Sequence, residues 1–158
     1  MTTARYVIDA NSLIQAWAVY PENHFPDLWA QLERLIAKKR LQSPAAVRDE
    51  LDAGSDQLKK WARQQKDFFV EHDEAVQKAL RTVMAIPGFV QPAGRRNYAD
   101  PWLVALGKHL GAVVITEEKG KGHTHGALKV PDMCRALQVH HSRFQGLFAS
   151  ENWTFKLR

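Results

Sequence analysis

The chain has 158 residues, which suits one domain and is long enough to bury a sizeable core. Hydrophobic residues make up 45% and charged residues 25%, and this balance excludes an intrinsically disordered chain. A net charge of +5 favours an acidic partner such as nucleic acid. The chain has a single cysteine, Cys134, which excludes an internal disulfide and a multi-cysteine zinc site. The cysteine content favours a reducing compartment, by default the cytoplasm, and we expect neither a targeting segment nor a membrane span.

Strand-like and helical patterns alternate along the chain. Residues 6–8 form a short β-branched and aromatic run that predicts a buried first strand. Helical spacing predicts a helix from about residue 12, capped by Asn11 or Ser12, and a second helix over 25–36. Later patterns predict helices at 44–54, 56–65, 73–84, 103–110, 131–137 and, as a turn or helix, 144–148, with strands at 41–43, 68–70, 112–115 and 138–140. The alternation predicts an α/β fold with a mostly parallel central sheet of about five strands flanked by helices, as one domain over residues 1–158.

Acidic residues follow two of these predicted strands. Asp9 comes directly after the first strand, and Thr116, Glu117 and Glu118 follow the strand that ends at residue 115. The carboxyl ends of parallel strands meet at one edge of a sheet, where ligands bind, so we expect these acids to converge.

Two further acids belong to the same hypothesis. Glu50 is predicted beside the apolar face made by Val47 and Leu51, and Asp100 stands before Pro101 at the start of a helix. Carboxylates held within a few ångströms of one another resist ionising together and generally need a cation. Oxygen ligands favour Mg²⁺ or Mn²⁺. The residues therefore suggest a metal-dependent phosphodiesterase site.

The order of these acids resembles that of the PIN-domain nucleases over roughly the whole chain. That family has a first strand ending in Asp with a nearby Asn or Ser, a helical Glu, an Asp that opens a later helix, and a last strand that runs into Thr-x-Asp. The matching residues are Asp9, Glu50, Asp100 and Glu118, supported by Asn11, Ser12 and Thr116. Glu118 departs from the commoner Asp and adds one methylene. The segment 131–134, together with Trp17 and Trp102, resembles a bacterial branch of uncharacterised PIN-like proteins.

The resemblance implies a metal-dependent endoribonuclease of the kind that acts as the toxin of bacterial toxin–antitoxin pairs. The four acids would hold one or two Mg²⁺ or Mn²⁺ ions that orient and activate water for attack on a phosphodiester. RNA phosphates would be contacted by Arg95, Arg96, Lys119 and Lys121. The implied partners are RNA and a cognate antitoxin protein, and whether the chain forms a homodimer stays open.

Each acid also has a purely structural interpretation. Asp9 and Asp100 both stand where a side chain can cap a helix. Glu50 has the alternative of a solvated side chain on an amphipathic helix, where Asp49 and Asp52 are neighbouring acids. Glu117 competes with Glu118 for the metal site, although the Thr-x-acid pattern selects Glu118. Asp132 is either an additional ligand or a cap, and the cap is favoured because a short helix follows it.

Two other function classes fit less well. A catalytically weak PIN-like module that binds RNA or a protein would carry the same acids without cleaving. A phosphotransferase of the haloacid dehalogenase type would need a second Asp two residues after Asp9, where Asn11 stands. Zinc is disfavoured, because the pairs His123/His125 and His140/His141 lack further ligands at suitable spacing.

Overall fold

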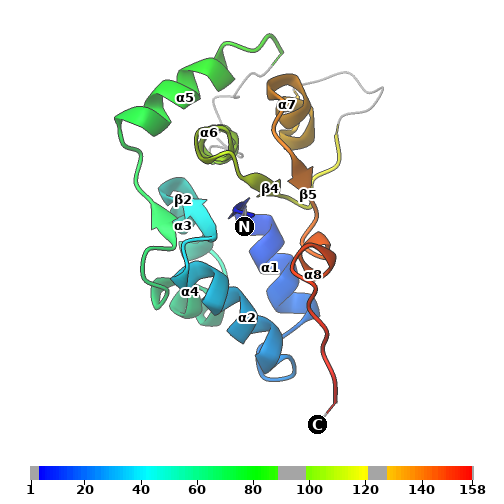
Figure 1. Ribbon diagram of the computed structural model, residues 1–158. Helices are drawn as coiled ribbons and strands as arrows, with labels where there is room; N and C mark the ends of the chain where they lie inside the picture. Colours follow the sequence, from blue (N-terminus) through cyan, green and yellow to red (C-terminus); the bar gives the residue numbers. More distant parts are fainter. Residues whose placement is uncertain (1–3, 89–98, 121–127, 158) are drawn as a thin grey trace.

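A computed structural model of the protein describes residues 4–88, 99–120 and 128–157. These ranges contain five strands and eight helices (Figure 1). The strands are β1 (Tyr6–Ile8), β2 (Leu41–Pro44), β3 (Phe69–Val70), β4 (Val113–Ile115) and β5 (His141–Ser142). The helices are α1 (Ala10–Val19), α2 (Pro26–Ala37), α3 (Ala45–Asp52), α4 (Asp56–Arg63), α5 (Glu74–Met84), α6 (Asp100–Leu110), α7 (Val130–Leu137) and α8 (Gly146–Ser150).

The five strands form one sheet in the order β3-β2-β1-β4-β5, and every pairing is parallel. In the centre of the sheet, Ile8 of β1 pairs with Ile115 of β4. The predicted α/β fold with a mostly parallel sheet of about five strands is therefore confirmed, and the described sheet is parallel throughout.

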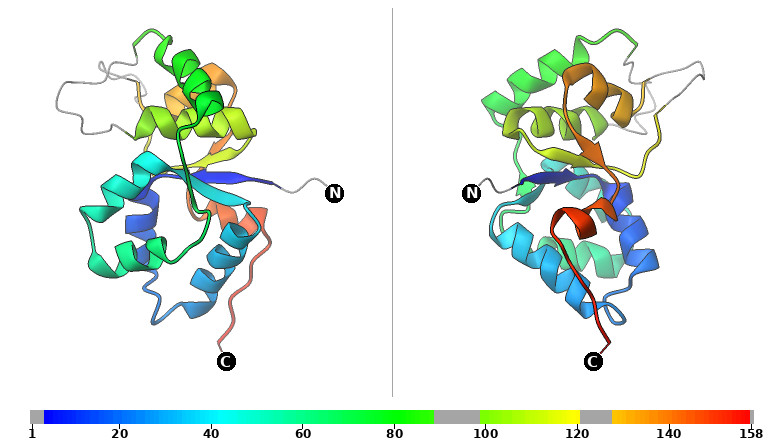
Figure 2. Two further views of the ribbon diagram at one scale, coloured as in Figure 1. Left: turned by 90° about the vertical axis from the view of Figure 1, so that its left-hand side faces the viewer. Right: turned by 45° about the vertical axis from the view of Figure 1, so that its right-hand side comes forward.

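Helices cover both faces of the sheet and bury two separate cores (Figures 1 and 2). Tyr6 and Ile8 point into the core shared with α1, α2, α3, α4 and α8, whereas Val7 points into the core shared with α5, α6 and α7. This alternation follows from the two-residue period of a strand. Because both faces are covered, the two central strands β1 and β4 are apolar at every position, as buried parallel strands usually are.

Three predicted boundaries are wrong, and local backbone geometry explains each of them. Asp9 is the N-cap of α1, and its side chain accepts a hydrogen bond from Ser12 N, so the capping interpretation of Asp9 is confirmed and Asn11 or Ser12 as the cap was wrong. Ala99, not Asp100, is the N-cap of α6, which makes Asp100 the first helical residue. The last strand lies at 141–142 rather than 138–140, because Gln138 adopts a left-handed conformation, with φ of 58°, that ends α7 before β5 can begin.

Within residues 4–88, 99–120 and 128–157, no helix combines the length and the apolar character that crossing a bilayer requires.

Candidate active site at the carboxyl edge of the sheet

The direction in which the sheet is built reverses between β1 and β4, and we use the word crevice for the place at the carboxyl ends of these two strands. From β1 the chain moves outward to β2 and β3 on one side, and it later returns to place β4 and β5 on the other side. In open α/β sheets such a reversal leaves a crevice at the carboxyl ends of the two central strands, and ligands bind there. Asp9 leaves β1 at this point, its backbone N–H donating to Ile115 O of β4 at 3.2 Å.

Asp9 is almost fully buried, with 6% of its surface exposed. Burial raises the pKa of its carboxyl, hydrogen bonds from Ser12 and Thr116 act to lower it, and the charge of Glu118 raises it further. Oδ1 accepts the backbone N–H of Ser12 at 2.8 Å, which is the helix cap. Asp9 therefore caps α1 and also faces another acid.

Glu118 reaches the crevice from the segment after β4. Its backbone N–H donates to Thr116 Oγ1 at 3.1 Å, and its Oε2 accepts the backbone N–H of Val130, the first residue of α7, at 3.0 Å. Its charge contributes to the raised pKa values of Asp9, Glu50 and Asp100. The structure thus brings Glu118 to the other three predicted acids.

Glu117 and Asp132 have different partners. Glu117 Oε2 pairs with Arg143 Nε at 3.1 Å and faces the backbone N–H of Phe144 at 3.4 Å. Asp132 accepts the backbone N–H of Lys129 at 2.8 Å and pairs with Arg135 at 2.7 Å. Asp132 is therefore a capping residue of α7. Of the adjacent acids Glu117 and Glu118, it is Glu118 that faces the other site carboxylates.

Glu50 enters the site from α3. The side chain is half-buried, whereas its neighbour Asp49 is exposed. Burial raises the pKa of Glu50, a hydrogen bond from the backbone of Ala99 acts to lower it, and the charges of Asp9 and Glu118 raise it. Its Oε1 is buried and has no hydrogen-bond partner among the described residues. A buried carboxylate oxygen without a donor is costly, so this atom is suited to an external ligand.

Asp100 is the fourth acid, at the first position of α6. Burial, together with the charges of Glu118, Asp9 and Glu50, raises the pKa of its carboxyl to about 8, and the charge of Lys129 acts against this shift. Four acids from four separate segments of the chain therefore interact at one edge of the sheet. Near neutral pH, the protein relieves their repulsion by keeping Asp100 largely protonated.

The donor set suits a hard divalent cation, but the side chains do not yet enclose one. In the described part of the chain, no three His, Cys, Asp or Glu residues form a group that could hold a metal ion as they stand. The chemistry nevertheless fits, because all four groups offer oxygen atoms, their charges repel one another, and Glu50 Oε1 lacks a donor. A bound Mg²⁺ or Mn²⁺ would take the place of the proton that now relieves this repulsion.

A family model described as a domain of unknown function, DUF4411, matches residues 6–155. The chain belongs to this family. The match runs from β1 to beyond α8, so all four acids of the crevice lie within the DUF4411 region. No curated protein is significantly similar to the chain.

Of the residues predicted to support the acids, some lie beside Asp9 in this DUF4411 protein and one does not. Ser12 and Thr116 are buried next to Asp9, and Ser12 Oγ lies 3.5 Å from Ile115 O. Asn11, in contrast, is exposed on α1. Within the described ranges, no hydrogen bond of Asn11 supports its predicted role.

The predicted phosphate-binding residues are only partly described. Lys119 is exposed directly after Glu118, whereas Arg95, Arg96 and Lys121 lie outside the described residues. Sequence reasoning missed Lys129, whose charge acts on Asp100. It belongs to no motif, and only the folding of α7 against the crevice brings it close.

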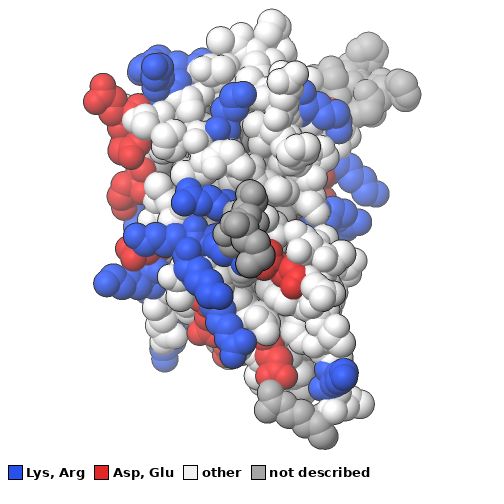
Figure 3. Space-filling model, in the orientation of Figure 1, with Lys and Arg blue, Asp and Glu red and all other residues white. Residues whose placement is uncertain are grey.

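Four basic residues of this DUF4411 protein stand at the opposite edge of the sheet. Arg5 precedes β1, and Lys38, Lys39 and Arg40 precede β2, so all four stand at the amino ends of parallel strands. Figure 3 shows Lys and Arg side chains gathered on this face, beside the start of the chain. A net charge of +5 therefore does not by itself place RNA at the acidic crevice.

Proposed function

We propose that this protein is a PIN-like, divalent-metal-dependent endoribonuclease that hydrolyses RNA phosphodiester bonds. The observation that carries the proposal is the meeting of Asp9, Glu50, Asp100 and Glu118 at the crevice between β1 and β4, where each raised pKa has neighbouring carboxylates among its causes. Such a repelling set is stable in its ionised form only with a cation.

Each residue has a defined role in this proposal. The four carboxylates would hold the cation, and Ser12 and Thr116 fix the orientation of Asp9 by hydrogen bonds. When bound, Mg²⁺ or Mn²⁺ would supply an activated water and stabilise negative charge on the phosphate. Lys119 and Lys129, which flank the acids, would contact backbone phosphates and position the RNA.

We further propose that the protein is the toxin of a bacterial toxin–antitoxin pair and acts in the cytoplasm. Support comes from the order of the acids along the chain, which resembles the toxin ribonucleases of the PIN family, and from the single unpaired cysteine, Cys134. The partners under this proposal are RNA and a cognate antitoxin protein.

A second candidate is a catalytically weak PIN-like module that binds RNA or a protein. It is favoured by one observation: in the described part of the chain the acids interact electrostatically without forming a group that already encloses a metal ion. In this case the acidic crevice would bind cations weakly and would not support hydrolysis.

Cleavage of RNA distinguishes the two candidates. Structured and unstructured RNAs are incubated with Mn²⁺, Mg²⁺ or EDTA and with the wild type, Asp100→Asn or Glu117→Gln. We expect metal-dependent cleavage by the wild type, loss of at least about 100-fold in rate for Asp100→Asn, and near-normal cleavage by Glu117→Gln, whose carboxylate pairs with Arg143. RNA binding without cleavage by the wild type would favour the binding module, and cleavage by Asp100→Asn at the wild-type rate would exclude the proposed site.

A further inference from the structure

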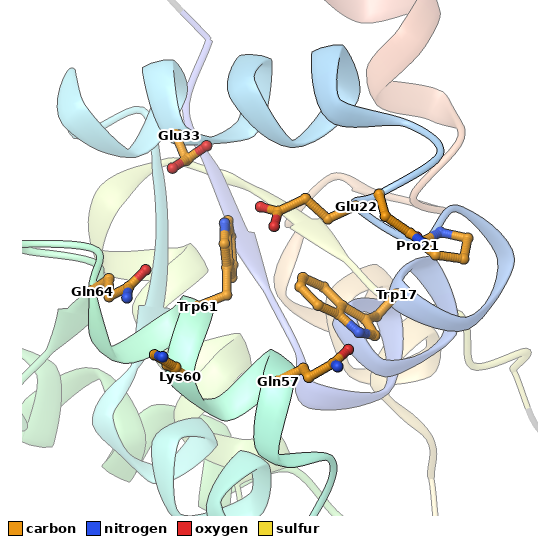
Figure 4. A pocket seen from close by; sticks show the side chains of 9 residues that line it. Trp17, Pro21, Glu22, Glu33, Gln57, Lys60, Trp61 and Gln64 are labelled. Carbon is orange, nitrogen blue, oxygen red and sulfur yellow. The ribbon is translucent and has the colours of Figure 1, made fainter.

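A cavity separate from the acidic crevice lies in the helical layer on one face of the sheet. It has a volume of about 500 Å³ and opens between α1, the segment after it, α2 and α4 (Figure 4). Side chains of Trp17, Glu22, Glu33, Lys60 and Trp61 line it. This volume lies within the range of small-molecule sites, and none of the four acids of the crevice contributes to the lining.

The wall of this cavity holds a buried donor without an acceptor. Trp61 is only 4% exposed, and its indole Nε1 is buried without a hydrogen-bond partner in the described residues. Trp29, which packs edge-on against Trp61, donates its own indole N–H to Tyr20 O at 2.7 Å. In Figure 4 the nitrogen of Trp61 points toward the side of the cavity that carries Glu33. Buried indole N–H groups usually find a partner, so this atom is available to a ligand or to a carboxylate that moves on binding.

The same cavity carries carboxylates that have no cation partner. Glu33 is half-buried and Glu22 is exposed, and neither has an ion pair or side-chain hydrogen bond in the described part of the chain. Lys60 is the one cation among the lining residues. Two carboxylates against one ammonium give the lining an excess of negative charge, which attracts a cationic group.

Trp17 adds an aromatic surface. Its half-buried ring lies 6.4 Å from the ring of Trp61, centroid to centroid, and the two planes are inclined by 49°. A cation over an indole face is attracted by the ring electrons. Among biological cations, a guanidinium also stacks on aromatic rings and donates two parallel N–H groups to a carboxylate, which a compact ammonium cannot do.

We propose that this cavity binds a guanidinium group borne on a short aliphatic chain with a carbonyl or carboxylate oxygen, as in arginine. The guanidinium pairs with Glu33 and Glu22 and lies against Trp17, while the oxygen accepts from Trp61 Nε1 or Lys60. The source is either free arginine or an arginine side chain of a peptide, because both carry this chemistry.

Calorimetry together with the NMR signal of the Trp61 indole N–H tests this binding. The probes are L-arginine, L-citrulline, agmatine and the peptide acetyl-Gly-Arg-Gly-amide. We expect arginine to bind and to shift the Trp61 signal. Citrulline, which has a neutral urea in place of the guanidinium, should bind at least about tenfold more weakly. Agmatine, which lacks the carboxylate, should have an affinity between those of arginine and citrulline. Tighter binding of the peptide than of arginine identifies a peptide as the source, and the reverse order identifies the free amino acid.

A charge-neutral variant and a matched control localise the binding. Glu33→Gln should weaken arginine binding about tenfold, whereas Glu74→Gln, at an exposed position of α5, and Asp100→Asn, in the crevice, should leave it unchanged. Citrulline binding as tightly as arginine, no binding of any probe, or full binding by Glu33→Gln would overturn the proposal. None of these results depends on nuclease activity.

Discussion

At Asp100, burial and the charges of three neighbouring acids raise the pKa to about 8. A carboxyl in the unfolded chain has a pKa near 4, so between these two values the folded protein binds more protons than the unfolded chain. Stability therefore falls as the pH rises through this interval. The buried cluster works against folding wherever no cation is bound.

Replacing Asp100 by Asn should consequently stabilise the metal-free protein. Asn resembles the protonated acid in shape and carries no charge, so we expect the free energy of unfolding in EDTA to rise by on the order of 1–3 kcal/mol at pH 7.5. The gain should disappear below about pH 3, where the Asp100 carboxyl is protonated in both the folded and the unfolded state. Urea unfolding of both proteins at several pH values measures this difference, and a variant less stable than the wild type at pH 7.5 would contradict the electrostatic account.

The sequence predicts some of these residues better than others. The Thr-x-acid pattern selects Glu118 rather than Glu117, and in the structure Glu118 faces the other acids while Glu117 pairs with Arg143. The two side chains diverge because successive residues of an extended segment point in opposite directions. The capping interpretation of Asp9 is confirmed, whereas Asn11 or Ser12 as the cap of α1 and Asp100 as the cap of α6 were wrong. Capping depends on the backbone angles of one residue, and several polar residues stand near each helix start. Lys129 could not be predicted, since its effect on Asp100 comes from tertiary packing alone.

Among the elements, α6 is the helix that brings Asp100 to the edge of the sheet, and it approaches β4 very closely. A Cβ atom built on Gly107 would lie 2.7 Å from Val114 Cγ2 and 3.4 Å from Val7 Cγ2. The missing side chain therefore permits this approach. The sequence predicted the helix correctly but gave no reason for its glycine, because the contact joins residues far apart in the chain.

The sign of the stability change in Gly107→Ala tests this packing. In an exposed helix the change from Gly to Ala stabilises by about 0.5–1 kcal/mol. Here we expect destabilisation by about 1–3 kcal/mol, because the new methyl group overpacks the contact with Val114. Chemical denaturation measures the effect, and any gain in stability would show that α6 moves away from the sheet without cost.

At the scale of the whole molecule, opposite edges of the sheet carry different charges. The carboxyl edge holds the four acids, whereas Arg5, Lys38, Lys39 and Arg40 stand at the amino edge (Figure 3). Arg40 is partly neutralised there, since its guanidinium forms two hydrogen bonds of 2.9 and 2.7 Å with Glu151 near the end of the chain. No sequence pattern predicts the contact between Arg40 and Glu151. The assignment of residues 1–158 to one domain stays a prediction.

Salt dependence of RNA binding identifies the edge that RNA contacts. Phosphate contacts release counterions, and we expect the double variant Lys119→Gln/Lys129→Gln to reduce the slope of log K against log salt by roughly 1 to 1.5. The matched control, Lys38→Gln/Lys39→Gln, removes the same charge from the amino edge and should leave the slope nearly unchanged. The opposite pattern in these binding titrations would place the RNA on the amino edge, away from the acids.

The central claim, that the four acids form one cation site, is tested most directly by calorimetric titration with Mn²⁺. We expect the wild type to bind the ion, and Asp9→Asn, Asp100→Asn and Glu118→Gln each to bind it at least about tenfold more weakly, because each variant removes one charged oxygen ligand. Glu117→Gln should retain the wild-type affinity, since Glu117 pairs with Arg143 instead. No binding by the wild type, or equal binding by all four variants, would contradict the account.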